Sequence, residues 1–411
     1  MNNHLKKLYN HFMKDSLYKN SIYLMLNAFV MGGLGFFFWM INSRLFNAHQ
    51  IGLGTTLISV ISLITTFSLL GLNIGLIRYL PTSKNKNNKI STAFTLSLLT
   101  SVIVSIIFLL GLKVFSPDLL FVKKNLYYSL FFIASMLFMT LFSLIDSVFV
   151  AYRDAKFVLI KNTIFSVLKL VFPFLLVGLG AFGIFGSYTL AATLAFLTAL
   201  LILIFKFKYK LKLVFYDDVL LKIFPFSFGN YIAGFFGGLP LMLLPLLITN
   251  LLRPELTAYY YIPMMIAALL FVIPGAISQS LFAEGSYDEK DLNKQIRKAV
   301  KFISLILIPA IIVVVVFGDY LLLLFGENYS AEGFRLLQIF AVSGVFVAIK
   351  SVYNSILNVR KKIKKLIFVN FAISSLILFL SYLMINKELM GIGYAWLIGN
   401  GAILLFLIFR K

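Results

Sequence analysis

The sequence predicts an all-α integral membrane protein, with twelve transmembrane helices in two pseudo-symmetric six-helix bundles around a central cavity. Three observations predict this fold: the composition, the distribution of basic residues and an internal repeat. Of the 411 residues, 61% are hydrophobic and 13% are charged, whereas a soluble domain is about 45–50% apolar and about 25% charged. This composition excludes a water-soluble enzyme and a disordered chain, and it indicates that the apolar excess faces lipid.

The apolar stretches define the helices in order. A helix that crosses the hydrocarbon core needs about 20 mostly apolar residues. We expect spans at 21–43, 51–77, 90–112, 126–151, 158–178, 183–205, 222–250, 257–282, 299–317, 336–357, 366–385 and 390–409. The longest connections, near 206–221, 283–298 and 318–335, hold fewer than 20 residues each, so no extramembrane domain fits between spans. Loop 318–335 is the largest outer loop, and we expect a short interfacial helix and turn there.

The domain organisation follows from these spans. We predict a cytoplasmic interfacial segment at 1–20, an N-terminal bundle at 21–205, a cytoplasmic linker at 206–221 and a C-terminal bundle at 222–411. Within the first segment, apolar residues at near-helical spacing favour an interfacial helix over 3–19, with an ordinary polar lead-in as the alternative. The apolar stretch that follows is too long for a cleaved signal peptide.

The basic residues sort by side of the membrane. Of the 37 Lys and Arg, 28 lie on the side of the N-terminus, seven on the opposite side and two, Lys169 and Lys350, within spans. Because Lys and Arg accumulate in cytoplasmic loops, both termini are predicted to be cytoplasmic. The net charge of +22 is then a feature of membrane topology, and nucleic-acid binding is the weaker interpretation of it.

An internal repeat relates the two halves. Residues 146–186 align without gaps with 354–394 at a constant offset of 208, and nine of the 41 positions are identical. Six helices fused to six helices, both entering from the cytoplasm, form a parallel repeat whose axis lies along the membrane normal. Such bundles usually enclose a site and alternate its access by rocking. The alternative is a duplicated scaffold without transport.

Glycine and proline mark helices 1, 7 and 8 of the predicted set. Helix 1 carries Gly32, Gly33 and Gly35, and the prolines of helices 7 and 8 are Pro240, Pro245, Pro263 and Pro274. Proline bends a helix by freeing a backbone carbonyl, and a bilayer tolerates this where protein or water covers the defect. These helices are therefore predicted to bend as cavity walls or hinges, with close packing as the alternative.

Charged residues inside the spans are the candidate site. Ionisable groups at depth are costly and are usually functional or paired. Lys169 and Lys350 are candidates for binding an anionic substrate such as a phosphate, and Arg44 and Arg78 could frame the same cavity or be interface anchors. Asp146 is a possible ion or salt-bridge residue, and a salt bridge to Lys169 across the hairpin of helices 4 and 5 is the structural alternative. At the offset of 208 none of Asp146, Lys169 and Lys350 is duplicated, so the shared scaffold does not require them.

Several chemistries are excluded or disfavoured. The chain has no cysteine, and its three histidines are scattered, so neither a thiolate nor a histidine metal site is expected. It lacks the G-x-S-x-G, H-E-x-x-H and P-loop motifs. We therefore predict a protein that is not an enzyme, with no cofactor and no metal.

Several segments resemble a known family. The chain is similar to lipid-linked oligosaccharide flippases, of the O-antigen type, in the polysaccharide-transporter family of the multidrug/oligosaccharidyl-lipid/polysaccharide exporter superfamily. The segments are LGLNIGLIRYLP (70–81), LFGENYSAEGFRLLQIF (324–340), NVRKKIKKLIFVN (358–370), GAFGIFG (180–186) and MGIGYAW (390–396). Twelve spans fit this family, whereas the related peptidoglycan-precursor flippases typically have fourteen.

The resemblance implies a function. The expected substrate is a polyprenyl (pyro)phosphate carrying a sugar chain, moved from the cytoplasmic to the outer leaflet of the cell membrane. The expected partners are this lipid-linked oligosaccharide, membrane lipids and proteins of polysaccharide assembly, and no nucleic acid. In this hypothesis Lys169 and Lys350 neutralise the phosphates.

Other functions remain open. An ion-coupled exporter of drugs or metabolites is the first alternative, although such exporters often carry an acidic residue in helix 1 or 7, which this chain lacks. A major-facilitator transporter has the same six-plus-six plan, but loop 79–89 lacks its Gly/Asp/Arg-rich signature. A membrane enzyme of polysaccharide assembly is the third alternative.

Overall fold

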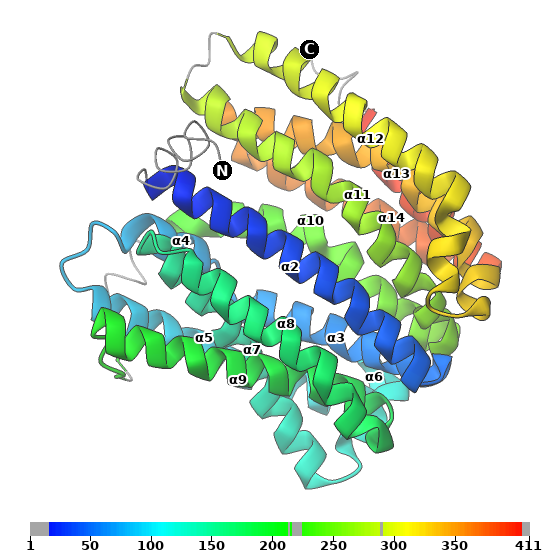
Figure 1. Ribbon diagram of the computed structural model, residues 1–411, viewed down its shortest axis with the longest axis horizontal. Coiled ribbons are helices and arrows are strands. Elements are labelled where there is room, and N and C mark those ends of the chain that lie inside the picture. Colours follow the sequence, from blue (N-terminus) through cyan, green and yellow to red (C-terminus); the bar gives the residue numbers. More distant parts are fainter. Residues whose placement is uncertain (1–15, 213, 216–223, 288–290, 405–411) are drawn as a thin grey trace, which may run out of the picture. The chain divides into compact units, whose positions relative to one another are not determined.

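The computed structural model describes residues 16–212, 214–215, 224–287 and 291–404 (Figure 1). Within these ranges the chain is helical and has no β-strand, and eleven helices are long and apolar enough to cross a membrane. The twelfth predicted span, 390–409, begins within α15 and continues past residue 404 into the part that is not described. The predicted interfacial helix at 3–19 lies almost entirely outside the described residues.

The helices follow one another with short connections. Their bounds are α2 (Ser16–Leu45), α3 (Ala48–Leu69), α4 (Leu72–Tyr79), α5 (Lys86–Leu110), α6 (Leu112–Phe115), α7 (Leu126–Ala151), α8 (Lys156–Leu176), α9 (Ala181–Phe207), α10 (Phe224–Leu251), α11 (Pro254–Tyr287), α12 (Leu292–Leu323), α13 (Glu327–Val359), α14 (Ile363–Leu383) and α15 (Glu388–Gly401). Short 3-10 turns lie at Pro117–Lys123, Val177–Leu179 and Ile385–Lys387.

The chain forms two compact units. Unit 1 comprises Met1–Leu45 and Ile61–Tyr231, and unit 2 comprises Phe46–Val60 and Ile232–Lys411. The units have other boundaries than the predicted bundles 21–205 and 222–411: residues 46–60, which include the first half of α3, pack within unit 2, and unit 1 continues to Tyr231.

Close contacts hold the first half of α3 in unit 2. A Cβ on Gly52 would lie 1.6 Å from the carbonyl oxygen of Pro254, so only glycine allows this approach of the two backbones. The hydroxyl of Thr56 lies 2.6 Å from that of Thr249, which lies 2.8 Å from that of Thr257. All three threonines are buried, so each hydroxyl needs such a partner.

Unit 1 packs α8 against α2 and α9, and α7 against α5 and α9. Its interior is rich in phenylalanine: the rings of Phe132 and Phe185 stack at 5.9 Å, and those of Phe142 and Phe165 lie 5.1 Å apart. Such offset and edge contacts add to the area that the large rings bury. The interface between α2 and α8 contains Lys169.

In unit 2, α13 is the central helix and packs against α11, α12 and α15. Trp396 of α15 donates from Nε1 to the hydroxyl of Ser343 at 3.0 Å, and its ring lies 6.0 Å from that of Phe340. The indole N–H is therefore satisfied although Trp396 is buried.

The internal repeat is visible in the backbone of each unit. The turn after α7 places Arg153 at φ 55°, and the turn after α13 places Lys361 at φ 56°, exactly 208 positions later in sequence. The amide of Asp154 donates to the carbonyl of Phe149 at 3.0 Å, and that of Lys362 donates to Leu357 at 2.8 Å. The aligned sequences therefore form the same hairpin turn.

The opposite ends of these hairpins also match. The 3-10 turns Val177–Leu179 and Ile385–Lys387 occupy equivalent positions, and each leads into a residue with positive φ, Gly180 at 57° and Glu388 at 48°. Cβ atoms built on Gly183 and Gly391 would each lie 2.1 Å from a backbone carbonyl oxygen of the preceding turn. Both copies of the repeat therefore form the same tight turn, and each copy requires a glycine at the equivalent position.

The second predicted span, 51–77, is not one continuous helix in the structure. Leu70 and Gly71 have φ values of 49° and 75°, so α3 ends at Leu69 and α4 begins at Leu72. The left-handed conformation ends the helix. Hydropathy did not reveal the break because the residues around it are apolar.

The prediction of an outer loop at 318–335 was wrong. α12 extends to Leu323 and α13 begins at Glu327, so the connection is only 324–326, with Gly326 at φ 134°. Asp319 accepts a hydrogen bond from Ser330 across this turn. The polar residues that suggested a loop are the ends of two long helices, of 32 and 33 residues.

The prolines of predicted helices 7 and 8 do not interrupt the helices. α10 contains Pro240 and Pro245, and α11 contains Pro263 and Pro274, and both helices are continuous. Pro263 packs closely on α13, where a Cβ on Gly333 would lie 2.8 Å from its ring. At this proline the structure favours close packing, the alternative to a cavity wall.

We predict that Gly183→Ala and Gly391→Ala each destabilise the protein. The added methyl would overlap a carbonyl oxygen at 2.1 Å, and overpacking of this kind typically costs about 1–3 kcal/mol. Thermal unfolding of the purified protein in detergent should show a lower Tm for both variants. Gly178→Ala and Gly234→Ala are matched controls, since a Cβ there meets no atom within 4 Å. Equal Tm values for all four variants would contradict the tight turn.

Candidate functional site

An ion pair crosses the hairpin of α7 and α8. Asp146 Oδ1 lies 2.8 Å from Lys161 Nζ, and the Lys161 side chain is fully buried. Lys161 also donates to the carbonyl of Phe142 at 2.6 Å, and its ammonium lies 3.3 Å from the centre of the Phe142 ring. This lysine is thus neutralised and hydrogen-bonded inside unit 1, which is the condition for burying a charge without a large penalty.

The partner of Asp146 is therefore Lys161 and not Lys169, the partner expected from sequence. The turn between α7 and α8 is centred near residues 153–154, so Asp146 and Lys161 lie at similar depths on either side of it. Lys169 is eight residues further along α8, about 12 Å deeper at a rise of about 1.5 Å per residue. Lys161 is one of the 28 basic residues that the sequence places on the side of the N-terminus, so its role as the partner of Asp146 was not predicted.

Lys169 is a buried cation that has no counter-charge among the described residues. Its ammonium lies 4.8 Å from the ring centre of Phe165 and 5.6 Å from that of Phe38 on α2. Only 4% of the residue is exposed. Among the described residues, its Nζ has no hydrogen-bond or ion-pair partner.

Gly35 of α2 lies beside this ammonium. A Cβ on Gly35 of α2 would be 3.9 Å from Lys169 Nζ, so the Gly35 backbone faces the charge. The rings of Phe38 and Phe165 offer their negative faces, which attract a cation but do not neutralise it. The arrangement is suited to an anion that would complete the set of contacts around Lys169.

Lys350 lies in unit 2, on α13. Its Nζ is 3.3 Å from the amide oxygen of Asn400 on α15, and Asn400 in turn donates to the carbonyl of Trp396 at 3.0 Å. Lys350 thus has one polar contact and, within the described part of the chain, no acidic partner. Lys169 and Lys350 belong to different units.

Arg44 and Arg78 lie at helix ends. Arg44 is exposed in the last turn of α2, and Arg78 is exposed in the last turn of α4, with its guanidinium 5.8 Å from the Tyr79 ring centre. Both belong to unit 1. Their positions suit interface anchors, which was one of the two interpretations from sequence.

Asparagines at equivalent repeat positions support both units. Asn162 of α8 donates to Asn27 of α2 at 2.8 Å, and Asn370 of α14 accepts from Asn354 of α13 at 3.2 Å. Asn162 and Asn370 are one of the identical pairs in the repeat. The identity of these two positions did not by itself predict that their amides join neighbouring helices.

Sequence analysis also missed the polar contacts around the first half of α3. Besides the threonine cluster of Thr56, Thr249 and Thr257, His49 Nδ1 lies 2.7 Å from Glu255 Oε1, with both side chains partly exposed. Within the described residues, no group of three or more His, Cys, Asp or Glu side chains could hold a metal ion.

The chain is similar to known proteins in its family, its sequence and its structure. A family model described as polysaccharide biosynthesis protein matches residues 41–333. A Shigella flexneri protein that is assigned as an O-antigen transporter is 27% identical over 154 residues, which are 36% of this chain and 37% of that protein. This pairwise match therefore spans well under half of either chain.

Solved structures share the fold. The lipid II flippase MurJ in an inward closed conformation has a TM-score of 0.78 at 14% identity, covering 95% of this chain and 87% of that one. An inward-facing multidrug resistance MATE family transporter of the MOP superfamily has a TM-score of 0.74 at 14% identity, covering 95% and 97%. An outward-facing structure described in the same way has 0.68 at 16%, covering 96% and 94%. The predicted fold class, that of an all-α multi-pass membrane protein, is confirmed.

We predict that Asp146→Asn destabilises the protein, because it leaves Lys161 buried without its counter-charge. Removing one partner of a buried pair costs up to about 3–5 kcal/mol. The double variant Asp146→Asn with Lys161→Met should recover much of the loss in Tm. Asp154→Asn is the control, since the Asp154–Lys206 pair at 2.6 Å is partly exposed and such pairs are worth about 0–1 kcal/mol. A double variant no more stable than Asp146→Asn would argue against the pairing.

Proposed function

The chain belongs to the polysaccharide biosynthesis protein family, and from this premise we propose that it is a flippase for a polyprenyl-(pyro)phosphate-linked oligosaccharide. In this proposal the substrate moves from the cytoplasmic to the outer leaflet of the cell membrane by alternating access. The match to an assigned O-antigen transporter and the fold shared with a lipid II flippase support a lipid-linked substrate.

The observation that carries the proposal is the unpaired ammonium of Lys169. A buried charge without a partner is costly in a membrane protein, and such residues usually serve a ligand or an ion. Lys169 offers its charge between two aromatic rings and the Gly35 backbone. A phosphate oxygen bound there would satisfy the ammonium through a charge-assisted hydrogen bond.

The remaining candidate residues have supporting roles in this proposal. Lys350 supplies a second positive charge, already held by Asn400. Arg44 and Arg78 attract the anionic head at the membrane surfaces. Asp146 has a structural role, because it neutralises Lys161.

The energetics need no cofactor and no catalytic step. The lipid tail stays in the bilayer while the head group crosses the membrane beside positive charges. These charges reduce the free-energy cost of removing water from the head group. Moving a dianion outward along an inside-negative potential releases about 4.6 kcal/mol per 100 mV, at about 2.3 kcal/mol per charge. The membrane potential can therefore drive the direction of transport.

The distribution of Lys and Arg supports cytoplasmic termini in this arrangement. The partners in the proposal are the lipid-linked oligosaccharide, the surrounding bilayer lipids and proteins that assemble the polysaccharide. No nucleic acid and no metal takes part.

An ion-coupled exporter is the second candidate, favoured by the shared fold of MATE family transporters. Its coupling residue would have to be Asp146, the only intramembrane carboxylate named from sequence. The ion pair with Lys161 opposes this role, since Asp146 is already compensated. Uptake of cationic dyes by inverted vesicles, abolished by Asp146→Asn while the fold is intact, would favour the exporter.

We predict that Lys169→Ala slows flipping by about tenfold to a hundredfold, because a hydrogen bond to a charged group is worth about 1.5–3 kcal/mol. The measurement is the transfer of a fluorescent polyprenyl-diphosphate sugar across proteoliposomes under a set potential. Lys169→Arg should keep part of the rate.

Lys364→Ala is the matched control for Lys169→Ala. Lys364 is exposed at the start of α14 and belongs to a basic turn with several other lysines, so the flipping rate should not change. A Lys169→Ala protein that folds normally and flips at the original rate would overturn the proposed role.

We predict a smaller effect for Lys350→Ala, about threefold to tenfold, because its ammonium already shares a neutral hydrogen bond worth about 0.5–1.5 kcal/mol. Asn400→Leu, which removes the partner and keeps the charge, should alter the dependence of the rate on phosphate charge. The comparison uses diphosphate and monophosphate forms of the same fluorescent lipid. If both variants and the original protein gave the same ratio of flipping rates for the diphosphate and monophosphate lipids, Lys350 would be excluded from substrate binding.

A further inference from the structure

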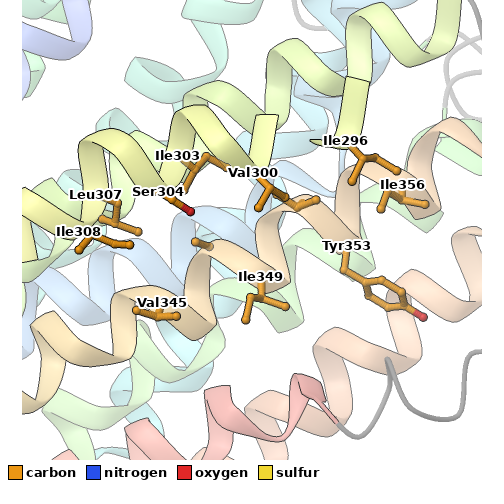
Figure 2. Close-up of a pocket in the computed structure, with 12 residues that line it drawn as sticks. Ile296, Val300, Ile303, Ser304, Leu307, Ile308, Val345, Ile349, Tyr353 and Ile356 are labelled. Atoms are coloured by element: carbon orange, nitrogen blue, oxygen red, sulfur yellow. The ribbon is translucent and has the colours of Figure 1, made fainter. Parts of the chain in front are cut away.

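A long apolar groove runs between α12 and α13 in unit 2. Figure 2 shows two rows of side chains along these helices, and the lining residues are Ile296, Val300, Ile303, Ser304, Leu307, Ile308, Val345, Ala348, Ile349, Val352, Tyr353 and Ile356. Apart from Ser304 and the aromatic side chain of Tyr353, the lining side chains are aliphatic. The groove encloses about 910 Å³ of space, including its open side.

The groove runs along α12 and α13. It begins near the first turns of α12 and the last turns of α13, and it ends at Ile308 and Val345, close to the middle of both helices. From Ile296 to Ile308 is twelve residues, or about 18 Å of helix. A hydrocarbon core about 30 Å thick places this groove in one leaflet, at the end of the helices that carries the basic turns.

Three basic residues, none of which lines the groove, lie close in sequence to its end at Ile296 and Ile356, which we call its mouth. Residues three or four positions apart share a helix face, so Arg297 and Lys301 continue the row that contains Ser304 and Ile308. Arg360 directly follows the last residue of α13 and lies four positions after Ile356. All three basic residues are exposed, and within the described part of the chain none forms an ion pair with an acidic residue.

An apolar groove with a cationic mouth is complementary to one chemical class, an amphiphile with an anionic head and a long hydrocarbon chain. The groove is a single channel between two helices, which suits one chain. A diacyl phospholipid would bring two chains. The branched aliphatic lining, with Ile at five positions, provides methyl groups against which a methyl-branched chain can pack.

We propose that this groove holds the isoprenoid chain of the lipid-linked substrate, with its phosphate at Arg297, Lys301 and Arg360. The inference rests on the proposed function and adds a separate docking site to it, since neither Lys169 nor Lys350 lines the groove. Holding the chain at one leaflet gives the head group a high effective concentration near the protein.

The test is photo-crosslinking of the full-length protein in nanodiscs. The probe is a long-chain polyprenyl phosphate with a diazirine in its isoprenoid chain, and the comparison probe is a diacyl phosphatidic acid with a diazirine in one acyl chain. Labelled peptides are identified by mass spectrometry. We expect the polyprenyl probe to label segments 296–308 and 345–356, with excess unlabelled polyprenyl phosphate competing far better than phosphatidic acid.

Groove-filling variants provide the specific loss. Val300→Trp and Val345→Trp place a large ring in the groove at residues that are 46% and 43% exposed, so the fold can accept them. Labelling should fall by about fivefold or more, equivalent to about 1 kcal/mol of binding. Leu305→Trp is the matched control, because Leu305 is 68% exposed at a similar depth on α12 and does not line the groove. A Tm measurement checks that all three variants are folded.

The role of the basic mouth is tested separately. Replacing Arg297, Lys301 and Arg360 together by glutamine should reduce labelling by the polyprenyl phosphate probe but not by a polyprenol probe of the same length, which lacks the charge. Equal reduction for both probes would overturn the assignment of the phosphate to this mouth.

The outcomes separate this inference from the proposed function. Equal labelling of the groove by both lipid probes would show a site for bilayer phospholipid and overturn the inference. Competed polyprenyl labelling elsewhere in the protein, with the groove unlabelled, would overturn the inference and leave the flippase proposal standing. No competed polyprenyl labelling anywhere would overturn both.

Discussion

A charged side chain in the hydrocarbon core of a bilayer needs a partner within the protein, and this constraint distinguishes Lys161, Lys169 and Lys350. Lys161 has a carboxylate, a carbonyl and an aromatic ring. Lys350 has one amide oxygen. Lys169 has two rings and, among the described residues, no polar partner. Lys161 therefore has a complete set of contacts, whereas those of Lys350 and Lys169 are incomplete. An anion would gain the most binding free energy at the two lysines whose contacts are incomplete.

The repeat separates what the scaffold needs from what is specific to one unit. The position equivalent to Asp146 is Asn354, which pairs with Asn370 by a neutral hydrogen bond. The position equivalent to Lys169 is Ile377, a buried residue against which Gly399 packs. Unit 2 thus builds the same hairpin, with the same turns and the same glycines, without either charge. Lys169 is therefore not a requirement of the fold, and the Asp146–Lys161 pair is one of two ways to close the hairpin.

Much of the fold could be predicted from sequence because long apolar stretches identify membrane helices directly. The predicted resemblance is confirmed by the family match over 41–333, and eleven described helices fulfil the criteria for spans. The errors arose where polarity and structure diverge. Residues around Asp319 and Ser330 are polar but helical, since they lie at the ends of α12 and α13. The break at Leu70 and Gly71 is apolar on both sides, so hydropathy passes over it.

The candidate site was only partly predictable for a related reason. Depth along a helix can be counted from sequence, and this selected Lys169 and Lys350. Counting did not identify Lys161 as the partner of Asp146. The position of the hairpin turn decides which residues of α7 and α8 face each other, and moving that turn by a few residues changes the pairs. The contacts of Gly52 with Pro254 and of Thr56 with Thr249 join distant segments, and no local pattern reveals them.

The first half of α3 constrains any transport cycle of this chain. Residues 46–60 belong to unit 2 and residues 61–69 to unit 1, yet both lie in one continuous helix. Rocking of the two units would strain α3 or separate its first half from Pro254, Thr249 and Thr257. Such a separation would break the hydrogen bond between Thr56 and Thr249. Thr56 would keep its hydrogen bond to the carbonyl of Gly52, and Thr249 would keep its contact with Thr257, so no hydroxyl would be left without a partner. The net cost is then that of one hydrogen bond, about 0.5–1.5 kcal/mol, so this polar contact could break at a small cost.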